Sequence, residues 1–270
     1  MANARKIAYA PVLIAQAIAT RQRALKLPEA AGERQGTLGD ARLRTLRLLI
    51  AGDSSAAGVG VEHQEDAVVG HLVRTVHRLL GGSVAWSLRA RSGLTTKGLL
   101  HLLRLEPPDP TDVAIVITGV NDVVCRVSAA RAVAHRALLV DWLIGRGLAR
   151  HVVFAPLPPI HRFPLLPEPL RRVMGDDAAR HDLALARFAA TRDDVSHAEV
   201  VLDLHAGVMA SDGFHPGAPV YRACGEQLGA HVAKTVAATE LARCATAGRR
   251  ELATPSGWAV AGLAHRSRRR

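Results

Sequence analysis

The chain alternates between short, continuously apolar runs and longer segments in which apolar residues recur every three or four positions. The apolar runs predict buried strands at residues 46–51, 84–88, 113–118, 150–155 and 199–204. The helical patterns fill the gaps, at about residues 65–80, 95–105, 128–146, 176–190 and 219–238. Because strands that alternate with helices usually pair in parallel, the sequence predicts an α/β fold with a doubly wound, five-stranded parallel sheet.

Three segments depart from this alternation. Residues 20–44 are polar and rich in glycine, which is typical of a linker or arm. Residues 156–175 contain six prolines and predict a long surface loop. Residues beyond 240 show weak periodicity and many arginines, which predicts a mobile tail. The expected organisation is an apolar N-terminal segment with its arm (1–44), an α/β domain (45–239) and a basic C-terminal tail (240–270).

Residues 7–19 form an apolar stretch that follows Arg5 and Lys6. The stretch fits the core of a signal peptide covering residues 1–19, which would export the protein. It equally fits a retained helix that packs on the domain or makes peripheral contact with a membrane surface. The basic residues Arg21 and Arg23 favour a retained helix, and with it a protein that is cytoplasmic or peripheral to a membrane.

The composition narrows the choice of partners. The formal net charge is +11, and nearly all positive charge is arginine, since the chain has lysine only at positions 6, 26, 97 and 234. The arginines are scattered, which indicates a solvated surface. The one dense basic cluster, residues 266–270, has no aromatic residues for base stacking. We therefore expect no nucleic-acid partner, while a basic binding protein whose tail engages nucleic acid or anionic lipid stays open as an alternative.

The cysteines and histidines do not predict a metal site. Cys125, Cys224 and Cys244 lack metal-ligand spacing, so they are expected to be reduced, buried thiols. The histidines match no zinc pattern. We expect neither a metal nor another cofactor.

Candidate catalytic residues follow the predicted strands. In an open parallel sheet, ligands bind beyond the carboxyl ends of the strands. Ser54 follows the first strand, Gly93 the second and Asn121 the third, while Asp212 and His215 come after the fifth. The predicted topology therefore brings residues that are far apart in the chain to one edge of the sheet.

These residue types together suit acyl transfer. The hydroxyl of Ser54 is a nucleophile once a base removes its proton, and His215 is the candidate base because an imidazole has a pKa of about 6.5 when unperturbed. Asp212, three positions before the histidine, can orient the ring. The backbone N–H groups of Ser54 and Gly93 and the amide of Asn121 can donate hydrogen bonds to an oxyanion.

The same residues resemble the SGNH/GDSL hydrolase superfamily over about residues 46–238. The matching blocks, in the family's order, are Gly52-Asp53-Ser54, Gly93, Gly119-Val120-Asn121-Asp122 and Asp212-Gly213-Phe214-His215. The resemblance implies a flavodoxin-like, three-layer α/β/α fold and a serine esterase without metal. It also implies Ser54 as the nucleophile in a triad with Asp212 and His215, and Gly93 and Asn121 as oxyanion donors.

The proline-rich loop bears on the substrate. Phe163, Leu165 and Leu166 form a local apolar cluster, which either packs over the sheet edge or walls a pocket for an acyl chain. The second interpretation favours small-molecule acyl esters, cleaved through an acyl-enzyme on Ser54. Alternatives of the same fold are a thioesterase, an acyltransferase and a carbohydrate O-acetyl esterase. The sequence does not indicate an oligomeric state.

Overall fold

The computed structural model describes residues 9–40 and 42–252, and the side chains up to residue 239. The chain divides into two units, Met1–Ala233 and Lys234–Arg270. The first unit contains the whole sheet, and the second consists, within the described residues, of the continuation of one helix. The predicted basic cluster at residues 266–270 lies outside the described residues.

The sheet confirms the predicted α/β class. It has six strands rather than the predicted five, in the order β1-β3-β2-β4-β5-β6. All neighbouring strands are parallel except β1, which pairs antiparallel with β3 at one edge. The strands are β1 (Gln35–Leu38), β2 (Thr45–Gly52), β3 (Ser83–Ala90), β4 (Val113–Ile117), β5 (His151–Phe154) and β6 (Val195–His197).

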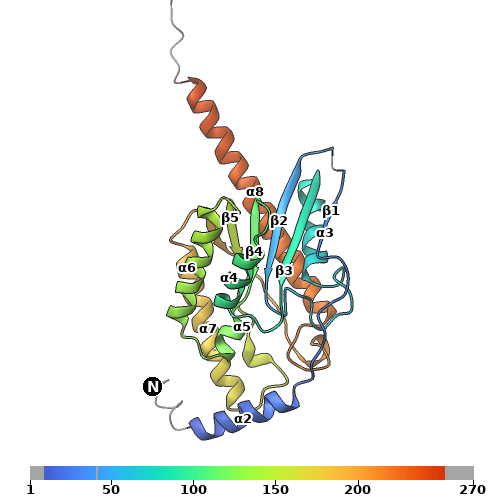
Figure 1. Cartoon of the computed structure of the whole chain (residues 1–270), viewed down its shortest axis with the longest axis vertical. Coiled ribbons are helices and arrows are strands. Elements are labelled where there is room, and N and C mark those ends of the chain that lie inside the picture. The colour runs from blue at the N-terminus through green and yellow to red at the C-terminus, as the bar shows by residue number, and fades with distance from the viewer. Residues whose placement is uncertain (1–8, 41, 253–270) are drawn as a thin grey trace, which may run out of the picture. The chain divides into compact units, whose positions relative to one another are not determined.

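A helix precedes β1, and at least one helix follows each of the strands β2 to β6 along the chain (Figure 1). The helices are α2 (Ala10–Arg23), α3 (Val68–Leu80), α4 (Thr96–Leu105), α5 (Val120–Val124), α6 (Ala129–Gly145), α7 (Leu170–Ala189) and α8 (Ala218–Leu252), with 3-10 turns η1 (Ile160–Arg162) and η2 (Ala206–Val208). Two helices begin where the sequence supplies an N-cap: the hydroxyl of Thr95 accepts from Gly98 N at the start of α4, and that of Ser128 accepts from Arg131 N at the start of α6.

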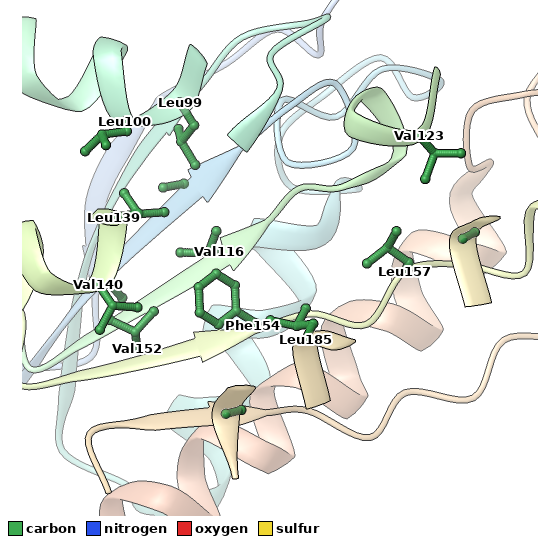
Figure 2. Packing of buried hydrophobic residues seen from close by; sticks show 14 of the residues in the cluster. Leu99, Leu100, Val116, Val123, Leu139, Val140, Val152, Phe154, Leu157 and Leu185 are labelled. Atoms are coloured by element: carbon green, nitrogen blue, oxygen red, sulfur yellow. The ribbon is translucent and has the colours of Figure 1, made fainter. Parts of the chain in front are cut away.

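Aliphatic side chains fill the space between the sheet and its helices. Figure 2 shows Leu139 of α6 and Leu185 of α7 near Val116 and Phe154 of the sheet, and all four are essentially inaccessible to solvent. The low aromatic content thus leaves the core to branched aliphatic residues, as the composition indicates.

The prediction of a strand at residues 199–204 is wrong. The last strand is β6, and only Val195–His197 pair with β5. The apolar run that follows is buried on one side only, since Leu204 is buried while Val201 is 82% exposed. The backbone of Val201 bonds to the side chain of Gln227, whose Oε1 lies 2.8 Å from Val201 N and whose Nε2 lies 2.9 Å from Val201 O.

Residues 20–44, expected to be a linker or arm, are part of the folded structure. The helix α2 extends to Arg23, and β1 adds an edge strand to the sheet. Ala30 N donates to Ala57 O at 3.1 Å, which joins this segment to the loop after β2. Apolar pattern alone missed the strand because β1 is mostly exposed.

The proline-rich segment is not a surface loop throughout. Ile160, Phe163, Leu166 and Leu170 are buried in the same core cluster as the sheet residues, and α7 already begins at Leu170. Prolines interrupt regular hydrogen bonding, but they do not prevent burial of the apolar residues between them.

The apolar N-terminal stretch forms α2 from residue 10 onward, while residues 1–8 lie outside the described residues. Leu13 is buried, whereas Val12, Ile14 and Ile18 are about half exposed. Among the described helices, none combines the length and hydropathy needed to cross a membrane. Contact of this helix with a membrane surface stays a prediction.

Candidate active site

Three residues predicted from the sequence lie in one hydrogen-bonded chain. Ser54 follows β2, and His215 and Asp212 belong to the loop that leads into α8. His215 Nε2 is 3.1 Å from Ser54 Oγ, and His215 Nδ1 is 2.5 Å from Asp212 Oδ2. With Nδ1 protonated, the imidazole donates to the carboxylate and its Nε2 can accept the serine proton.

The loop that carries Asp212 is held by its own carboxylate. Asp212 Oδ1 accepts from the backbone N–H groups of Phe214 and His215, at 2.9 Å each. Gly213 between them has φ +64°, a conformation that glycine adopts without strain. Burial raises the pKa of Asp212, but the hydrogen bonds from His215 and Phe214 outweigh it and lower the pKa below its usual value. The carboxylate is therefore ionised and fixed against the ring.

Asp53 supports the turn that presents Ser54. Its backbone N–H donates to Ile117 O at the end of β4, and its Oδ1 accepts from Ser55 N at 3.0 Å. Burial raises the pKa of Asp53 to about 7, against the lowering effect of the Ser55 N–H and the charge of His215. The backbone contacts agree with the interpretation of Asp53 as a structural acceptor.

Asn121 connects the loops that follow three strands. It belongs to α5, directly after β4. Its Nδ2 donates to Leu94 O at 3.1 Å and lies 3.4 Å from Asp53 Oδ2, so the amide lies between the Ser54 turn and the loop that contains Gly93. Gly93 has φ +81° and no atom within 4 Å of where a Cβ would stand. Its backbone is therefore open on that side.

Asp122, the next residue, is buried and anchors this region. Its carboxylate accepts from Thr96 N at 3.2 Å and from Thr96 Oγ1 at 2.6 Å. Arg136 Nη2 of α6 lies 3.8 Å from the same carboxylate, and both side chains are fully buried. Asp122 thereby ties α5 to α4 and α6, which agrees with its interpretation as a structural acceptor.

The three residues proposed to contact substrate lie beside the histidine loop. Phe163 packs edge-on against Phe214, with ring centroids 5.2 Å apart. Leu165 N donates to Gly213 O at 3.0 Å. Phe163 also lines a small cavity of about 40 Å³ together with Ser54 and His215, while Leu165 and Leu166 line a much larger cavity.

The larger cavity has a volume of about 1100 Å³ and opens beside Asp212 and His215. Its other walls come from α2, α7 and residues 123–129. Sequence reasoning missed the contribution of α2. The only signal was the apolar stretch itself, and nothing in its pattern told where the helix would pack.

Cys125 differs from the prediction of a buried thiol, whereas Cys224 is at least partly buried. Cys125 is exposed and lines the larger cavity. Burial raises the pKa of Cys224 to about 12. The side chain of Cys244 lies outside the described part of the chain. Within that described part, no cluster of three or more His, Cys, Asp or Glu residues could hold a metal ion.

Known proteins are similar to the part of the chain that contains the candidate active site. A sequence profile of the GDSL-like lipase/acylhydrolase family matches residues 50–223. A protein of Mycobacterium tuberculosis described as a GDSL-like esterase is 27% identical over 187 residues, which cover 65% of this chain. The match spans 58% of the length of that relative.

Solved structures share the fold. A lipase from a goat rumen metagenome aligns with a TM-score of 0.56 at 18% identity, over 68% of this chain and 96% of that chain. A member of the lipolytic G-D-S-L family from Veillonella parvula aligns with a TM-score of 0.52 at 13% identity, over 67% of this chain and 95% of that chain. The profile spans most of the chain and contains the Ser54 and Asp212 positions, so the protein belongs to the GDSL-like lipase/acylhydrolase family.

Proposed function

We propose that the protein is a serine hydrolase that cleaves carboxylic esters through an acyl-enzyme on Ser54. The observation that carries the proposal is the distance of 3.1 Å between Ser54 Oγ and His215 Nε2, with the opposite ring nitrogen 2.5 Å from Asp212. Nucleophile, base and orienting carboxylate are thus in contact before substrate binds. Membership of a family of lipases and acylhydrolases supports the same chemistry.

The first half-reaction breaks the ester bond. His215 Nε2 takes the proton of Ser54 Oγ as the oxygen attacks the carbonyl carbon, and Asp212 stabilises the imidazolium that forms. The tetrahedral intermediate collapses, the alcohol leaves with the proton held by His215, and the acyl group stays on Ser54. In the second half-reaction a water loses a proton to His215 and attacks the acyl-enzyme, and His215 then returns the proton to Ser54 Oγ as the acid leaves.

The oxyanion of each intermediate needs hydrogen-bond donors. The backbone N–H groups of Ser54 and Gly93 and the amide of Asn121 are the candidates. The Asn121 amide carries two hydrogens, and its contact with Asp53 at 3.4 Å is long enough to be exchanged for an oxyanion. The hydrogen bond to Leu94 O would keep the amide in place during that exchange.

The decisive test is substitution of the nucleophile. Ser54→Ala should lower kcat for p-nitrophenyl butyrate by at least about 10³-fold, because the variant lacks the hydroxyl that would carry the acyl group. A fluorophosphonate probe should label wild-type protein on Ser54 and leave Ser54→Ala unlabelled.

Ser55 is the neighbouring hydroxyl and serves as the matched comparison. Ser55→Ala should retain the label, because the hydroxyl of Ser54 is the one within hydrogen-bond distance of His215. A label mapped to Ser55, or turnover that survives in Ser54→Ala, would refute the proposal.

A further inference from the structure

The larger cavity joins the proposed hydrolytic site to an element outside the matched family region. The cavity of about 1100 Å³ is lined at one end by Asp212, Phe214 and His215. Residues of α2 also line the cavity, whereas the family profile begins at residue 50. The N-terminal helix thus lies outside the residues that the profile matches, and it lines the space next to the candidate triad.

Specific contacts fix α2 to the rest of the wall. Gln16 Nε2 donates to Glu168 O at 2.6 Å, and Gln16 Oε1 accepts from Leu170 N at 3.1 Å. The amide therefore pairs with the backbone at the start of α7. Leu13, one turn before Ala17, is 6% exposed and belongs to the hydrophobic core cluster. Figure 1 shows α2 beside the N-terminal end of α7.

The lining of the cavity changes character from its floor to its rim. Four of the buried lining residues are aliphatic, namely Leu13, Val123, Leu166 and Leu170, and the other two, His181 and Asp212, are polar. The arginines of the lining, Arg21, Arg126 and Arg180, are exposed. The four aliphatic residues, which we call the aliphatic floor, offer no hydrogen-bond partner to the hydroxyl groups of a sugar, which would lose their hydrogen bonds to water against it. A hydrocarbon chain has no hydrogen bonds to lose there, and moving its apolar surface out of water is favourable.

We propose that α2 completes an acyl-chain pocket, and that the substrates are esters of long aliphatic acids. This inference rests on the proposed serine hydrolase function. An acetyl group would leave most of the cavity filled only with water, whereas pockets for whole drug-sized ligands measure roughly 300–1,000 Å³. The acyl chain enters beside His215 and runs between α2 and α7 over the aliphatic floor.

The test places a large side chain on α2 so that it occupies part of the pocket. Ala17 lines the cavity, whereas Ala15 on the same helix is exposed and does not line it. Ala17→Trp should lower the ratio of kcat/KM for p-nitrophenyl dodecanoate to that for p-nitrophenyl acetate by at least about tenfold, which corresponds to returning about two methylene groups to water. Ala15→Trp, the same substitution at the exposed position, should leave both kcat/KM values unchanged. An unchanged ratio in Ala17→Trp, or an equal fall in both variants, would overturn the inference.

A binding measurement separates this inference from the proposed hydrolysis. In a Ser54→Ala background, the affinity for a dansyl-labelled undecanoic acid should fall at least about tenfold on adding Ala17→Trp and stay the same on adding Ala15→Trp. Equal affinities would reject the pocket even if the enzyme hydrolyses esters. Loss of affinity combined with turnover in Ser54→Ala would keep the pocket and reject the proposed nucleophile.

A second variant guards against a folding defect. Val173 of α7 lines the same cavity and is half-buried. If Ala17→Trp lacks the circular dichroism spectrum of the wild type, Val173→Trp replaces it in both measurements. We expect the same fall in the kcat/KM ratio and in the affinity for the dansyl-labelled acid. An unchanged ratio in a folded Val173→Trp would overturn the pocket.

Discussion

At the scale of single residues, Asp53 shows how burial changes a group that the sequence marks only as acidic. The residue is 2% exposed and stands directly before the candidate nucleophile. Its carboxylate has the Ser55 N–H and the Asn121 amide as donors, yet loss of solvent dominates and raises its pKa to about 7. Sequence motifs identify this position, but only the packing around it shifts the titration.

The shift predicts a pH-dependent difference between wild type and Asp53→Asn. The folded-state pKa, about 7, lies above the unfolded value of about 3.9. The folded state holds the proton of Asp53 more tightly than the unfolded state does. Its contribution to the free energy of unfolding is therefore complete below the unfolded pKa and is lost as the pH rises to about 7. The free energy of unfolding of wild type minus that of Asp53→Asn should therefore fall over this range and be level above it. Urea unfolding at several pH values measures the difference, and a constant difference would contradict the raised pKa.

At the scale of elements, the short helix α5 depends on the turn that begins it. Gly119 has φ +132°, and a Cβ there would lie 2.8 Å from Arg136 Nη2 and 2.9 Å from Leu157 Cγ. Both the backbone conformation and the neighbouring side chains therefore require glycine. The turn decides where Asn121 and Asp122 point, since both lie in the helix that follows.

Gly119→Ala should destabilise the protein by about 2–3 kcal/mol and lower the proposed esterase activity, because relief of the clash moves Asn121. Gly145, the last residue of α6, has no atom within 4 Å of its Cβ position. Gly145→Ala should accordingly be neutral or stabilise by up to about 1 kcal/mol. Thermal and urea unfolding compare the two variants, and equal effects would show that the turn does not constrain residue 119.

Whether a strand could be predicted from the sequence depended on how it is buried. The strands β2, β4 and β5 were found because each contains a continuous apolar run that is largely buried within the sheet, and β3 was found from the shorter apolar run at its centre although it is only partly buried. The run at 199–204 looks alike, but its burial comes from one side and its backbone bonds to Gln227. The edge strand β1 was missed because an exposed strand shows no apolar pattern.

At the scale of the whole molecule, one buried charge pair joins the site to the helical layer. Arg136 of α6 is fully buried, and its guanidinium has no hydrogen-bond partner among the described residues. Its charge is offset by Asp122, 3.8 Å away, which also holds Thr96 of α4. Burial lowers the pKa of Arg136, while the Asp122 and Asp182 carboxylates oppose that effect.

Removing one member of the Arg136–Asp122 pair should therefore lower the free energy of unfolding by more than the pair as a whole contributes to it. Arg136→Met should destabilise by about 3–5 kcal/mol, because Asp122 is left buried without its counter-charge. Arg131→Met, at an exposed position of the same helix, should change stability by less than about 0.5 kcal/mol. Adding Asp122→Asn to Arg136→Met should restore part of the loss, as a coupled pair requires. Additive losses in the double variant would show that the two groups do not interact.

The sequence by itself determined the parallel sheet and the order of the motifs. Apolar periodicity is local, and the carboxyl ends of parallel strands meet at one edge whatever fills the rest of the chain. Only the tertiary structure decided the 3.1 Å contact between Ser54 and His215, the raised pKa of Asp53 and the place of α2. The contacts that seat α2 join Gln16 to residues more than 150 positions away. Such pairings depend on how the chain closes in space, which no local pattern of hydrophobic and polar residues encodes.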